Sequence, residues 1–594
     1  MSIVPLLKVT LYGLIEEKEQ VFAELQDLGL LHLVPLSEAH GDAAAGPTPQ
    51  ARNALKFLLA TRPRRRQVHD AGRFDAKVVE QRALEVQSHI RDLEDRRDFL
   101  RRRIQDLEPW GDFRLFQEET PEGLQLWFYI LHHYQLDRIP KDDLIWEVVH
   151  RDNRFSYVVV LSVDEPQGMP VERTHTGKVP LSQLRRDLED TEVELEDLQA
   201  ERVSLSRWCD LFASSINRLE DRASLDDVLG RTYDEPPLFA LQGWVAQPEA
   251  GRVRKFAAAQ HLALVIEPPS AGEQPPTLMD NPEPVAGGQN LVSFYMTPGY
   301  TTWDPSLIVF FSFALFFAMI MSDAGYALVL GAIVALYWRR MGRSNTGKRL
   351  RNLFLALTGA SLLWGMLTGS YFGTAPPAGT PLAALHLLDI NDTATMMRLS
   401  VVIGVLHIAM ANLADAWRRR HSFGALAPLG WVVLLAGGMV LWLASDGTGP
   451  TVLKQTGPWL MTVGGAAVLF FSGEQGGVFR RLLSGLLALT RITSAFGDVL
   501  SYLRLFALGI ASASLALAFN DLAGNIAAQS PAFGKLLALL ILLLGHGLNF
   551  GLAVMSGFVH GLRLNFIEFF NWSVSEEGYP FRAFARKEGT EWNR

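Results

Sequence analysis

The sequence predicts a mixed fold in two parts. The first part is an N-terminal cytoplasmic arm of antiparallel coiled coil with two small α/β lobes. The second is an all-α transmembrane domain of eight helices, of which the last two are long and tilted. Three observations lead to this prediction: residues up to about 290 are charged and mixed in composition, residues from about 305 are mostly apolar, and the first part contains two heptad repeats.

The composition limits where the first part resides and what it binds. The chain has 594 residues, of which 48% are hydrophobic, and a net charge of −8. This length indicates several domains, and the acidic balance disfavours nucleic acid as a partner. Cys209 is the single cysteine, so no intrachain disulfide can form. Residues 1–8 lack the basic start and apolar run of a signal peptide, so we expect a cytoplasmic arm.

Two segments predict the same order of strand, helix and strand. The first is residues 3–36, and the second is residues 238–267. We expect the two segments to share one proximal lobe, formed by residues 1–70 and 225–267. Residues 39–50 are rich in alanine, glycine and proline and predict a loop within this lobe.

Heptad repeats predict the coiled coil between the two segments of the proximal lobe. Apolar residues recur at two heptad positions over 79–107 and again over 181–219, with charged residues around them. We therefore predict antiparallel helices over 78–108 and 181–221, with a distal lobe over 110–178 at their far end. The strand-like runs of that lobe are Leu126–Leu131, Ile145–His150 and Phe155–Ser162.

A linker and eight apolar segments follow the arm. Residues 268–290 contain six prolines and three glycines, which predict a linker that ends the arm at residue 290. Residues 291–594 then form the membrane domain. Its predicted spans are 305–321, 324–338, 350–372, 397–417, 426–444, 457–472, 482–520 and 533–572. The loops after every second span are basic, which predicts cytoplasmic termini if a break near Asp323 separates the first two spans.

An arginine stands near the middle of the seventh span. A helix over 482–520 would be roughly 58 Å long, so it must tilt or protrude from a hydrocarbon core of about 30 Å. Arg504 costs at least about 2.5–3.5 kcal/mol to insert, which favours a functional role. Its helix face carries small residues, which ordinary helix packing also explains. They are Gly497, Ser501, Ala507, Ala511, Ser514 and Ala518.

The last span carries a polar face over about five turns. Steps of three and four residues give His546, Asn549, Ala553, Ser556, His560 and Arg563. Such a face is either a buried hydrogen-bonding seam or the wall of an aqueous ion path. The presence of an arginine on each of the last two spans favours the ion path.

The two arginine segments are similar to those of a known family. Ser501–Leu505 and His560–Leu564 resemble the two arginine motifs of subunit a, also called subunit I, of the rotary V-type and A-type ATPases. Asp323–Tyr326 and Trp364–Ser370 resemble two further motifs of that family. The resemblance covers the whole chain, and the paired arginine motifs are its most specific part.

The resemblance implies a stator subunit that forms ion half-channels against a rotating proteolipid ring with a membrane carboxylate. It also implies that peripheral stalk subunits bind the lobes, and that a membrane-sector subunit associated with the central stalk is a neighbour. We expect a multi-pass protein of a bacterial plasma membrane with no nucleic-acid partner and no metal, cofactor or nucleotide of its own. Residues 342–348 match most of a phosphate loop, but Arg349 stands where a serine or threonine should be.

The resemblance assigns Arg504 as the primary charge and Arg563 as its companion in ion translocation. The residues expected to line the half-channels are His546, Asn549, Ser556, His560, Ser501, Ser512 and Glu568. Glu568 is alternatively an interfacial carboxylate. Eukaryotic members carry glutamate where Ala553 stands and histidine where Ser512 stands, which changes the makeup of the path. The sequence does not indicate whether the transported ion is a proton or sodium. It also does not indicate whether the complex chiefly synthesises or hydrolyses ATP, or the size of the ring.

A secondary active transporter with a cytoplasmic regulatory arm is the alternative. That class requires a substrate site at the membrane midplane, usually made by broken helices in two related halves. The first four spans show no such repeat of the last four. Purification separates the two hypotheses, because a rotary subunit should bring down a proteolipid ring and stalk proteins.

Overall fold

A computed structural model describes most of the chain in two compact units. The described residues are 2–37, 46–113, 123–140, 144–444, 451–473, 478–529, 533–574 and 576–587. One unit contains residues 2–37 and 231–585, and the other contains residues 46–230 and 586–587.

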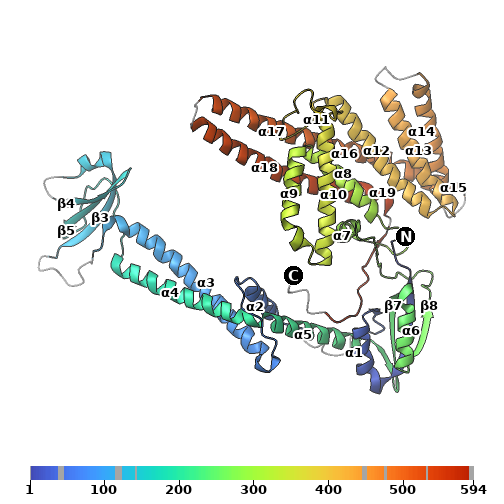
Figure 1. The fold of residues 1–594 in the computed structure, drawn as a ribbon, viewed down its shortest axis with the longest axis horizontal. Coiled ribbons are helices and arrows are strands. Elements are labelled where there is room, and N and C mark those ends of the chain that lie inside the picture. Colours follow the sequence, from blue (N-terminus) through green and yellow to red (C-terminus); the bar gives the residue numbers. More distant parts are fainter. Residues whose placement is uncertain are drawn as a thin grey trace. The chain divides into compact units, whose positions relative to one another are not determined.

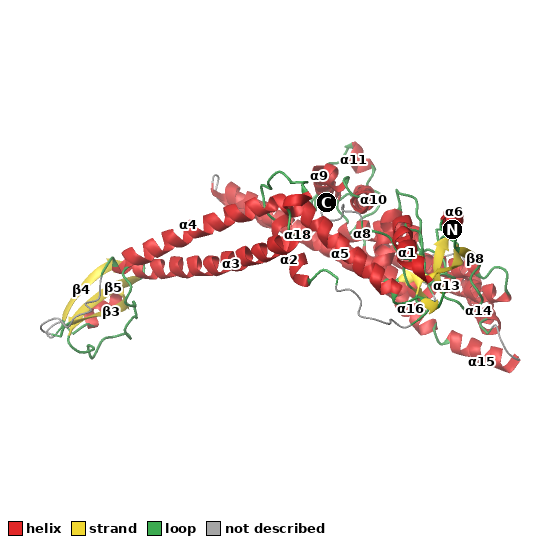
Figure 2. Ribbon diagram, turned by 90° about the horizontal axis from the view of Figure 1, so that it is seen from below, coloured by secondary structure: helices red, strands yellow, loops and turns green. Residues whose placement is uncertain are grey.

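The second unit is built on a pair of long antiparallel helices. Helix α3 (Ala76–Leu107) and helix α4 (Leu181–Leu205) pack along each other, as Figures 1 and 2 show. Helix α5 (Cys209–Leu229) continues α4 after one 3₁₀ turn. The buried residues of α3 are Val79, Ala83, Val86, Ile90, Leu100 and Leu107, all from the two predicted heptad positions. The apolar spacing of the sequence therefore identified the face on which α3 packs.

A short helix, which the sequence analysis did not predict, covers the base of this pair. Helix α2 (Pro49–Leu59) begins inside the predicted loop over 39–50, of which residues 39–45 lie outside the described residues. The Thr48 hydroxyl accepts a hydrogen bond of 3.0 Å from the Ala51 amide, and Pro49 occupies the first helical position. Both features favour the start of a helix. The loop prediction is therefore wrong for residues 49 and 50.

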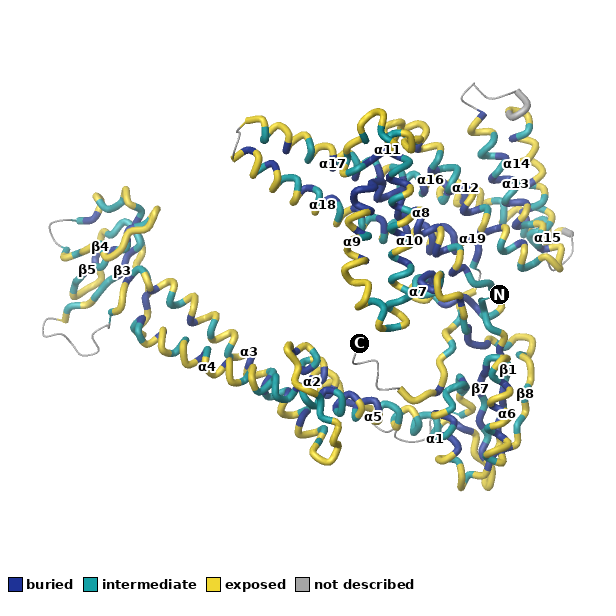
Figure 3. The backbone as a smooth tube through the Cα atoms, viewed as in Figure 1, coloured by how far each residue is buried: buried dark blue, intermediate teal, exposed yellow. Residues whose placement is uncertain are grey.

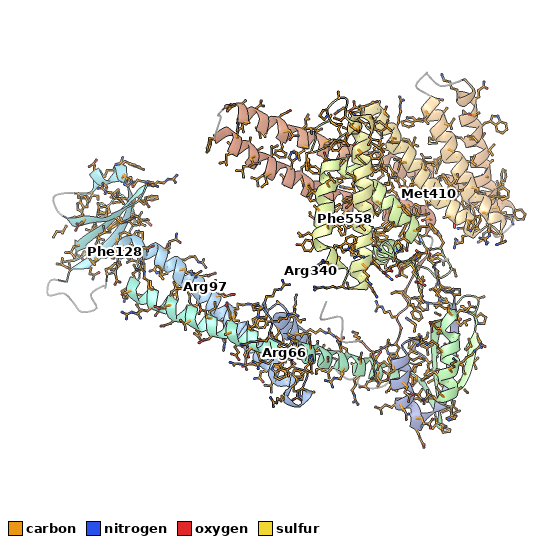
Figure 4. All side chains as sticks on the ribbon, viewed as in Figure 1. Arg66, Arg97, Phe128, Arg340, Met410 and Phe558 are labelled. Atoms are coloured by element: carbon orange, nitrogen blue, oxygen red, sulfur yellow. The ribbon has the colours of Figure 1, made fainter. Side chains whose placement is uncertain are left out.

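A three-stranded antiparallel sheet lies at the far end of α3 and α4. Its strands are β3 (Gln125–His132), β5 (Phe155–Ser162) and β4 (Ile145–Arg151), in that spatial order. Phe128, which Figure 4 labels in this sheet, packs edge-on against Trp110 at the end of the helix pair. The three strands match the predicted runs, while residues 114–122 and 141–143 of the predicted distal lobe lie outside the described residues.

The first unit joins the two ends of the predicted arm in one sheet. Strand β1 (Leu6–Leu14) pairs antiparallel with β7 (Leu238–Ala246) and β8 (Ala263–Glu267). Strands β2 (His32–Val34) and β6 (Tyr233–Glu235) pair with β7. The helices of this sheet are α1 (Lys18–Leu28) and α6 (Ala250–Ala259), and Phe22 of α1 packs on Phe239 of β7. The two distant segments therefore pair in one sheet, whereas residues 46–70 and 225–230 of the predicted proximal lobe belong to the other unit.

The rest of the first unit is helical. Its helices are α7 (Ala286–Tyr295), α8 (Ser306–Met321), α9 (Ala324–Met341), α10 (Asn345–Thr368), α11 (Pro381–Ala384), α12 (Thr393–Arg418), α13 (Leu426–Ala444), α14 (Thr451–Phe471), α15 (Val478–Leu489), α16 (Ile492–Ser501), α17 (Leu503–Gln529), α18 (Phe533–Arg563) and α19 (Phe570–Ser573). Strand β9 (Thr297–Pro298), near the start of this helical part, pairs antiparallel with β10 (Glu577–Gly578), which follows its last helix. Five segments of the described chain are long and apolar enough to cross a membrane. They are Asn345–Thr368, Thr393–Arg418, Phe423–Ala444, Phe479–Gln529 and Phe533–Ser573.

Helix α8 lies at the centre of this helical part. Most of its residues are buried, which Figure 3 shows as a dark segment among partly exposed helices. Helices α10, α17 and α18 all pack against it. Phe313 and Phe317 of α8 lie 5.4 Å and 5.5 Å from the ring of Phe558 of α18, which is labelled in Figure 4. Helix α8 thus provides the scaffold against which the two arginine-bearing helices are positioned.

The first two apolar segments are separate helices, as the sequence predicted. Ser322 adopts a left-handed conformation with φ of 46°, and Asp323 then caps α9. The Asp323 carboxylate accepts a 2.9 Å hydrogen bond from the Tyr326 amide. Both helices pack against α10.

The seventh predicted span is interrupted at two points. The run from Phe479 to Gln529 is divided into α15, α16 and α17, with the second break at Tyr502. The Tyr502 amide bonds the carbonyl of Val499, three residues back, which tightens the turn. Its buried ring packs on Gly404 of α12, where an added Cβ would lie 2.7 Å from the ring. Periodicity along one segment carries no information about this contact with a distant helix, so the sequence predicted an unbroken helix.

Candidate functional site

A buried carboxylate connects the two segments that carry arginine. Glu568 is only 3% exposed, and its Oε1 accepts a 2.5 Å hydrogen bond from the Ser501 hydroxyl. The same Oε1 lies 3.9 Å from Nη1 of Arg504 and 4.0 Å from Nε of Arg563. Arg504 also donates from Nη2 to the Ser501 hydroxyl at 2.9 Å. Four of the predicted site residues therefore meet at one point, which we name the arginine–carboxylate cluster.

A change of helical geometry brings Glu568 to this point. Helix α18 ends at Arg563, and residues Leu564–Phe569 form a π-helical turn before α19. A π turn is wider than an α turn and is frequently found at functional sites. Asn565 is anchored in this turn by the Ser312 hydroxyl of α8, which donates to its Oδ1 at 2.5 Å. The turn therefore directs Glu568 toward α17, although Glu568 comes five residues after Arg563 in the same helical segment.

The cluster has an excess of positive charge. Among the described residues, Glu568 is the one carboxylate within ion-pair distance of either arginine. Two guanidinium groups therefore face one carboxylate in a part of the protein with few polar groups. Nη1 of Arg504 is buried without a hydrogen-bond partner in the described chain. An arginine side chain stays protonated in proteins, so the excess charge is permanent.

The face of α17 that carries Arg504 is open. Its small residues at helical spacing, Ala507, Ala511, Ser514 and Ala518, are exposed in this chain, as is Gly497 on the preceding helix α16. A Cβ added at Gly497 would have no atom within 4 Å. Small side chains allow a second helix to approach closely within lipid. The Arg504 side chain is itself 23% exposed, so another helix on this face would lie beside its guanidinium group.

A second polar network lies between α9, α17 and α18. The Tyr326 hydroxyl is 2.9 Å from Nδ1 of His546 and accepts a 2.9 Å hydrogen bond from Asn549. Asn549 also donates to the Ser512 carbonyl at 2.8 Å, and Nε2 of His546 lies 3.0 Å from Oδ1 of Asn520. We name these five residues the tyrosine–histidine network. It contains three of the predicted path residues in a seam that is otherwise apolar.

The remaining two path residues belong to neither group. No hydrogen bond in the described part of the chain joins Ser556 or His560 to the cluster or to the network. His560 has a buried Nδ1 without a hydrogen-bond partner among the described residues. The continuous polar face predicted for the last span is therefore two separate polar groups, with Ser556 and His560 on the helix between them.

Asp323 is a buried structural residue in this geometry. Besides capping α9, its carboxylate accepts hydrogen bonds from the Ser370 hydroxyl at 2.7 Å and from the Gly373 amide at 2.9 Å. Gly365 allows this close approach, because a Cβ there would lie 2.2 Å from the Ala324 amide. The two further motifs identified in the sequence therefore meet in one joint between α9 and α10.

Sequence reasoning missed a buried pair that supports the cluster. His407 of α12 is 2% exposed, and its Nδ1 lies 2.7 Å from the hydroxyl of Tyr502, which is also buried. The His407 ring stacks on Phe569 at 4.4 Å, next to Glu568. A histidine within an apolar run was the available signal. Tyr326 and Asn520 were also missed, although Tyr326 stands in one of the recognised motifs.

The described residues contain no group of three histidine, cysteine, aspartate or glutamate side chains arranged to bind a metal ion. The arrangement instead holds fixed positive charge and hydrogen-bonding groups among apolar helices. Fold and site together define a membrane protein in which two arginines meet one buried carboxylate between the long final helices.

Comparison with known proteins finds relatives that share one name. No family model matches the chain. V-type ATP synthase subunit I of Chlamydia trachomatis serovar D is 25% identical over 648 residues, with 95% of each chain covered. A-type ATP synthase subunit I of Methanocaldococcus jannaschii is 26% identical over 441 residues, which cover 67% of this chain and 63% of that protein. The curated homologues of this chain are therefore V-type and A-type ATP synthase subunit I proteins, and its apolar helices are consistent with a membrane-sector subunit.

One solved structure also shows similarity to part of the chain. It is the cytoplasmic N-terminal domain of subunit I, the homologue of subunit a, of V-ATPase. The two chains are 18% identical, the match covers 44% of this chain and 99% of that chain, and the TM-score is 0.20.

Proposed function

We propose that this chain is the stator subunit of the membrane sector of a V/A-type rotary ATPase. In this role it forms the ion half-channels against a rotating proteolipid ring and anchors peripheral stalks. The observation that carries the proposal is the arginine–carboxylate cluster at the open small-residue face of α17. The names of the homologues support the same complex.

The open face of α17 is the surface that the proposal assigns to the ring. A ring helix approaching over Ala507 and Ala511 meets no large side chain on those residues and comes beside Arg504. The excess positive charge of the cluster then favours the ionised form of a carboxylate on that helix. The ring carboxylate releases its proton or other bound cation there, and the fixed charge keeps ions from passing directly between the two half-channels.

Glu568 and Ser501 act on the arginines rather than on the ion in this mechanism. The carboxylate attracts both guanidinium groups, and the hydroxyl bridges it to Arg504. At about 4 Å, each charge pair is attractive by about 4 kcal/mol at an effective dielectric constant near 20. This attraction restrains Arg504 at the edge of the open face, so little freedom is lost when the ring carboxylate arrives.

The tyrosine–histidine network supplies part of one half-channel. Its hydroxyl, imidazole and amide groups form a chain of hydrogen bonds from Ser512 to Asn520. An imidazole can accept a proton on one nitrogen and release one from the other, and its ordinary pKa is near neutrality. Ser556 and His560, which lie between the network and Arg563 along α18, extend the path. A water-filled route next to these residues would deliver ions to the ring.

The remaining features follow from the same proposal. Eight spans place both termini in the cytoplasm of a bacterial cell, with residues 1–290 as the arm and 291–594 as the ion-translocating domain. The helix pair and its lobes contact peripheral stalk subunits, and the membrane domain contacts a subunit associated with the central stalk. The basic clusters at Arg339–Arg340 and Arg418–Arg420, each at the end of an apolar segment, support this orientation.

Proton pumping by vesicles that contain the whole complex tests the proposal. Arg504→Lys and Arg504→Gln should each reduce ATP-driven proton or sodium uptake at least tenfold while the complex still assembles. Arg340→Gln, which removes an exposed arginine labelled in Figure 4, is the matched control and should retain the full rate. Uptake at the unmutated rate in both Arg504 variants would refute the role of this residue. Purification of the chain without any proteolipid would instead favour a transporter.

A further inference from the structure

The loop between α12 and α13 carries positive charge beside an apolar groove. Both helices belong to segments long and apolar enough to cross a membrane, and residues 419–422 would then lie at a bilayer surface. The end of α12 and this loop contain Arg418, Arg419, Arg420 and His421 in succession. Basic clusters at this depth are positioned to meet lipid headgroups.

The four basic side chains are not equivalent. Arg418 and Arg419 bond the carboxylate of Asp415 at 3.0 Å and 3.1 Å, so their charge is partly balanced. The Arg420 guanidinium instead lies over the Trp417 ring, 5.0 Å from its centre, and donates to the Trp417 carbonyl at 3.4 Å. No carboxylate of the described chain is within ion-pair distance of Arg420 or His421. These two side chains therefore present cationic or hydrogen-bonding groups without an internal counter-ion.

Two grooves meet at these two residues. The first lies between the last turns of α12 and the first turns of α13, has a volume of about 560 Å³, and is lined by apolar side chains such as Leu413, Leu426 and Leu429. The second, also of about 560 Å³, extends to residues 2–5 and 300–304. Arg420 and His421 line both grooves. Both volumes are within the range of sites that hold small organic ligands.

One carboxylate of the described chain, that of Asp304, also faces the second groove, but it is not within ion-pair distance of Arg420 or His421. It accepts hydrogen bonds from Asn281 at 2.6 Å and from the Ser306 amide at 2.8 Å. The first groove has exposed aromatic residues at its edge, since Trp417 is 70% exposed and Phe423 is 83% exposed. Aromatic side chains at this depth are typical of the membrane interface.

We propose that the first groove binds one anionic phospholipid, with its phosphate on Arg420 and His421 and an acyl chain along Leu413, Leu426 and Leu429. A soluble phosphate would use the cations but not the apolar wall. A zwitterionic lipid would bring a second positive charge next to Arg420. The occupant that matches both the charge and the apolar wall is a lipid with a net negative headgroup. The inference depends on the two membrane segments and not on the proposed rotary function.

Native mass spectrometry of the full chain in detergent tests the site with equal amounts of phosphatidylglycerol and phosphatidylcholine. The protein should retain phosphatidylglycerol in preference. The double variant Arg420→Gln/His421→Gln should retain at least fivefold less of it, whereas Arg339→Gln/Arg340→Gln, which removes two exposed charges from the last turn of α9, should retain as much as the unmutated chain. Phe423→Ser keeps the charges and should reduce retention about threefold through the apolar wall.

Three results would overturn the proposal. The first is equal loss of phosphatidylglycerol in both double variants, which indicates attraction to any basic loop. The second is unchanged retention in Arg420→Gln/His421→Gln. The third is displacement of the lipid by millimolar inorganic phosphate, which indicates a site for the free anion. If the double variant does not fold, His421→Gln alone should still reduce retention at least twofold, and no reduction in that variant also refutes the site.

Discussion

Replacement of Glu568 by glutamine isolates the charge of the arginine–carboxylate cluster. The amide has the same shape and can still accept a hydrogen bond from Ser501, but it no longer attracts the guanidinium groups at 3.9 Å and 4.0 Å. Removal of one partner from a buried ion pair costs about 3–5 kcal/mol, whereas an exposed pair contributes at most about 1 kcal/mol. Arg504 is 23% exposed and Arg563 is 52% exposed, so water screens part of the interaction. We expect Glu568→Gln to reduce the free energy of unfolding by about 1–3 kcal/mol, between the two limits.

A double-mutant cycle measures this interaction directly. Unfolding of the detergent-solubilised chain is compared for Glu568→Gln, Arg504→Gln and the double variant, with Arg340→Gln as the control for loss of an exposed charge. The coupling energy between the two positions should be at least about 0.5 kcal/mol, as is usual for residues in contact. Uptake driven by ATP should fall in the Glu568→Gln complex, because Arg504 loses the group that restrains it. Additive stability effects together with unchanged uptake would refute the reasoning.

Three further predictions concern other contacts. Asp323→Ala should lower the free energy of unfolding by about 1–3 kcal/mol through loss of a helix cap and of two further hydrogen bonds, one buried and one partly buried, and Asp323→Asn should lose less. Tyr326→Phe should slow ATP-driven uptake severalfold without loss of assembly, because its hydroxyl joins the hydrogen bonds of the network. Burial raises the pKa of Glu220, but hydrogen bonds from Lys587 and Arg52 outweigh it and leave this pKa below its usual value. The stability that Glu220 contributes should therefore be present above about pH 4.5 and be lost as the pH falls through its lowered pKa.

Each of these predictions has a distinct readout. Thermal unfolding of the detergent-solubilised chain follows the two Asp323 variants, and equal melting temperatures for alanine and asparagine would contradict the capping role. Proton uptake at the full rate in Tyr326→Phe would remove the hydroxyl from the path. For Glu220→Gln, the difference in melting temperature from the unmutated chain should be larger at pH 7 than at pH 3.5. A difference that does not change with pH would show that the charge of Glu220 is not the cause.

The sequence predicted the elements whose signal is local. Heptad spacing identified the packing face of α3, and the apolar segments of the second half all contain helices. The pairing of residues 3–36 with 238–267 was also predicted correctly, because both segments show the same order of elements and neither is long enough to bury a sheet alone. The missed helix α2 shows the limit, since its start depends on a cap at Thr48 that follows a region rich in loop-forming residues.

The relation between Glu568 and the arginines illustrates what local periodicity could not predict. In a regular α-helix, five residues at about 100° each place Glu568 about 140° around the axis from Arg563, on a different face. The π turn changes this angle, and its wider winding is stabilised by contacts such as that of Asn565 with Ser312. Periodicity therefore left Glu568 as either a path residue or an interfacial carboxylate.

By itself, the sequence determined that two arginines lie in long apolar segments, because hydropathy and charge are properties of each segment alone. Only the tertiary structure decided that Arg504 and Arg563 share one buried carboxylate, while the polar residues near Tyr326 form a separate group. The physical reason is that α17, α18 and α8 pack through side chains far apart in the chain. The distances between those side chains follow from that packing and from the turn at Tyr502, and neither is encoded in the spacing of residues along one helix.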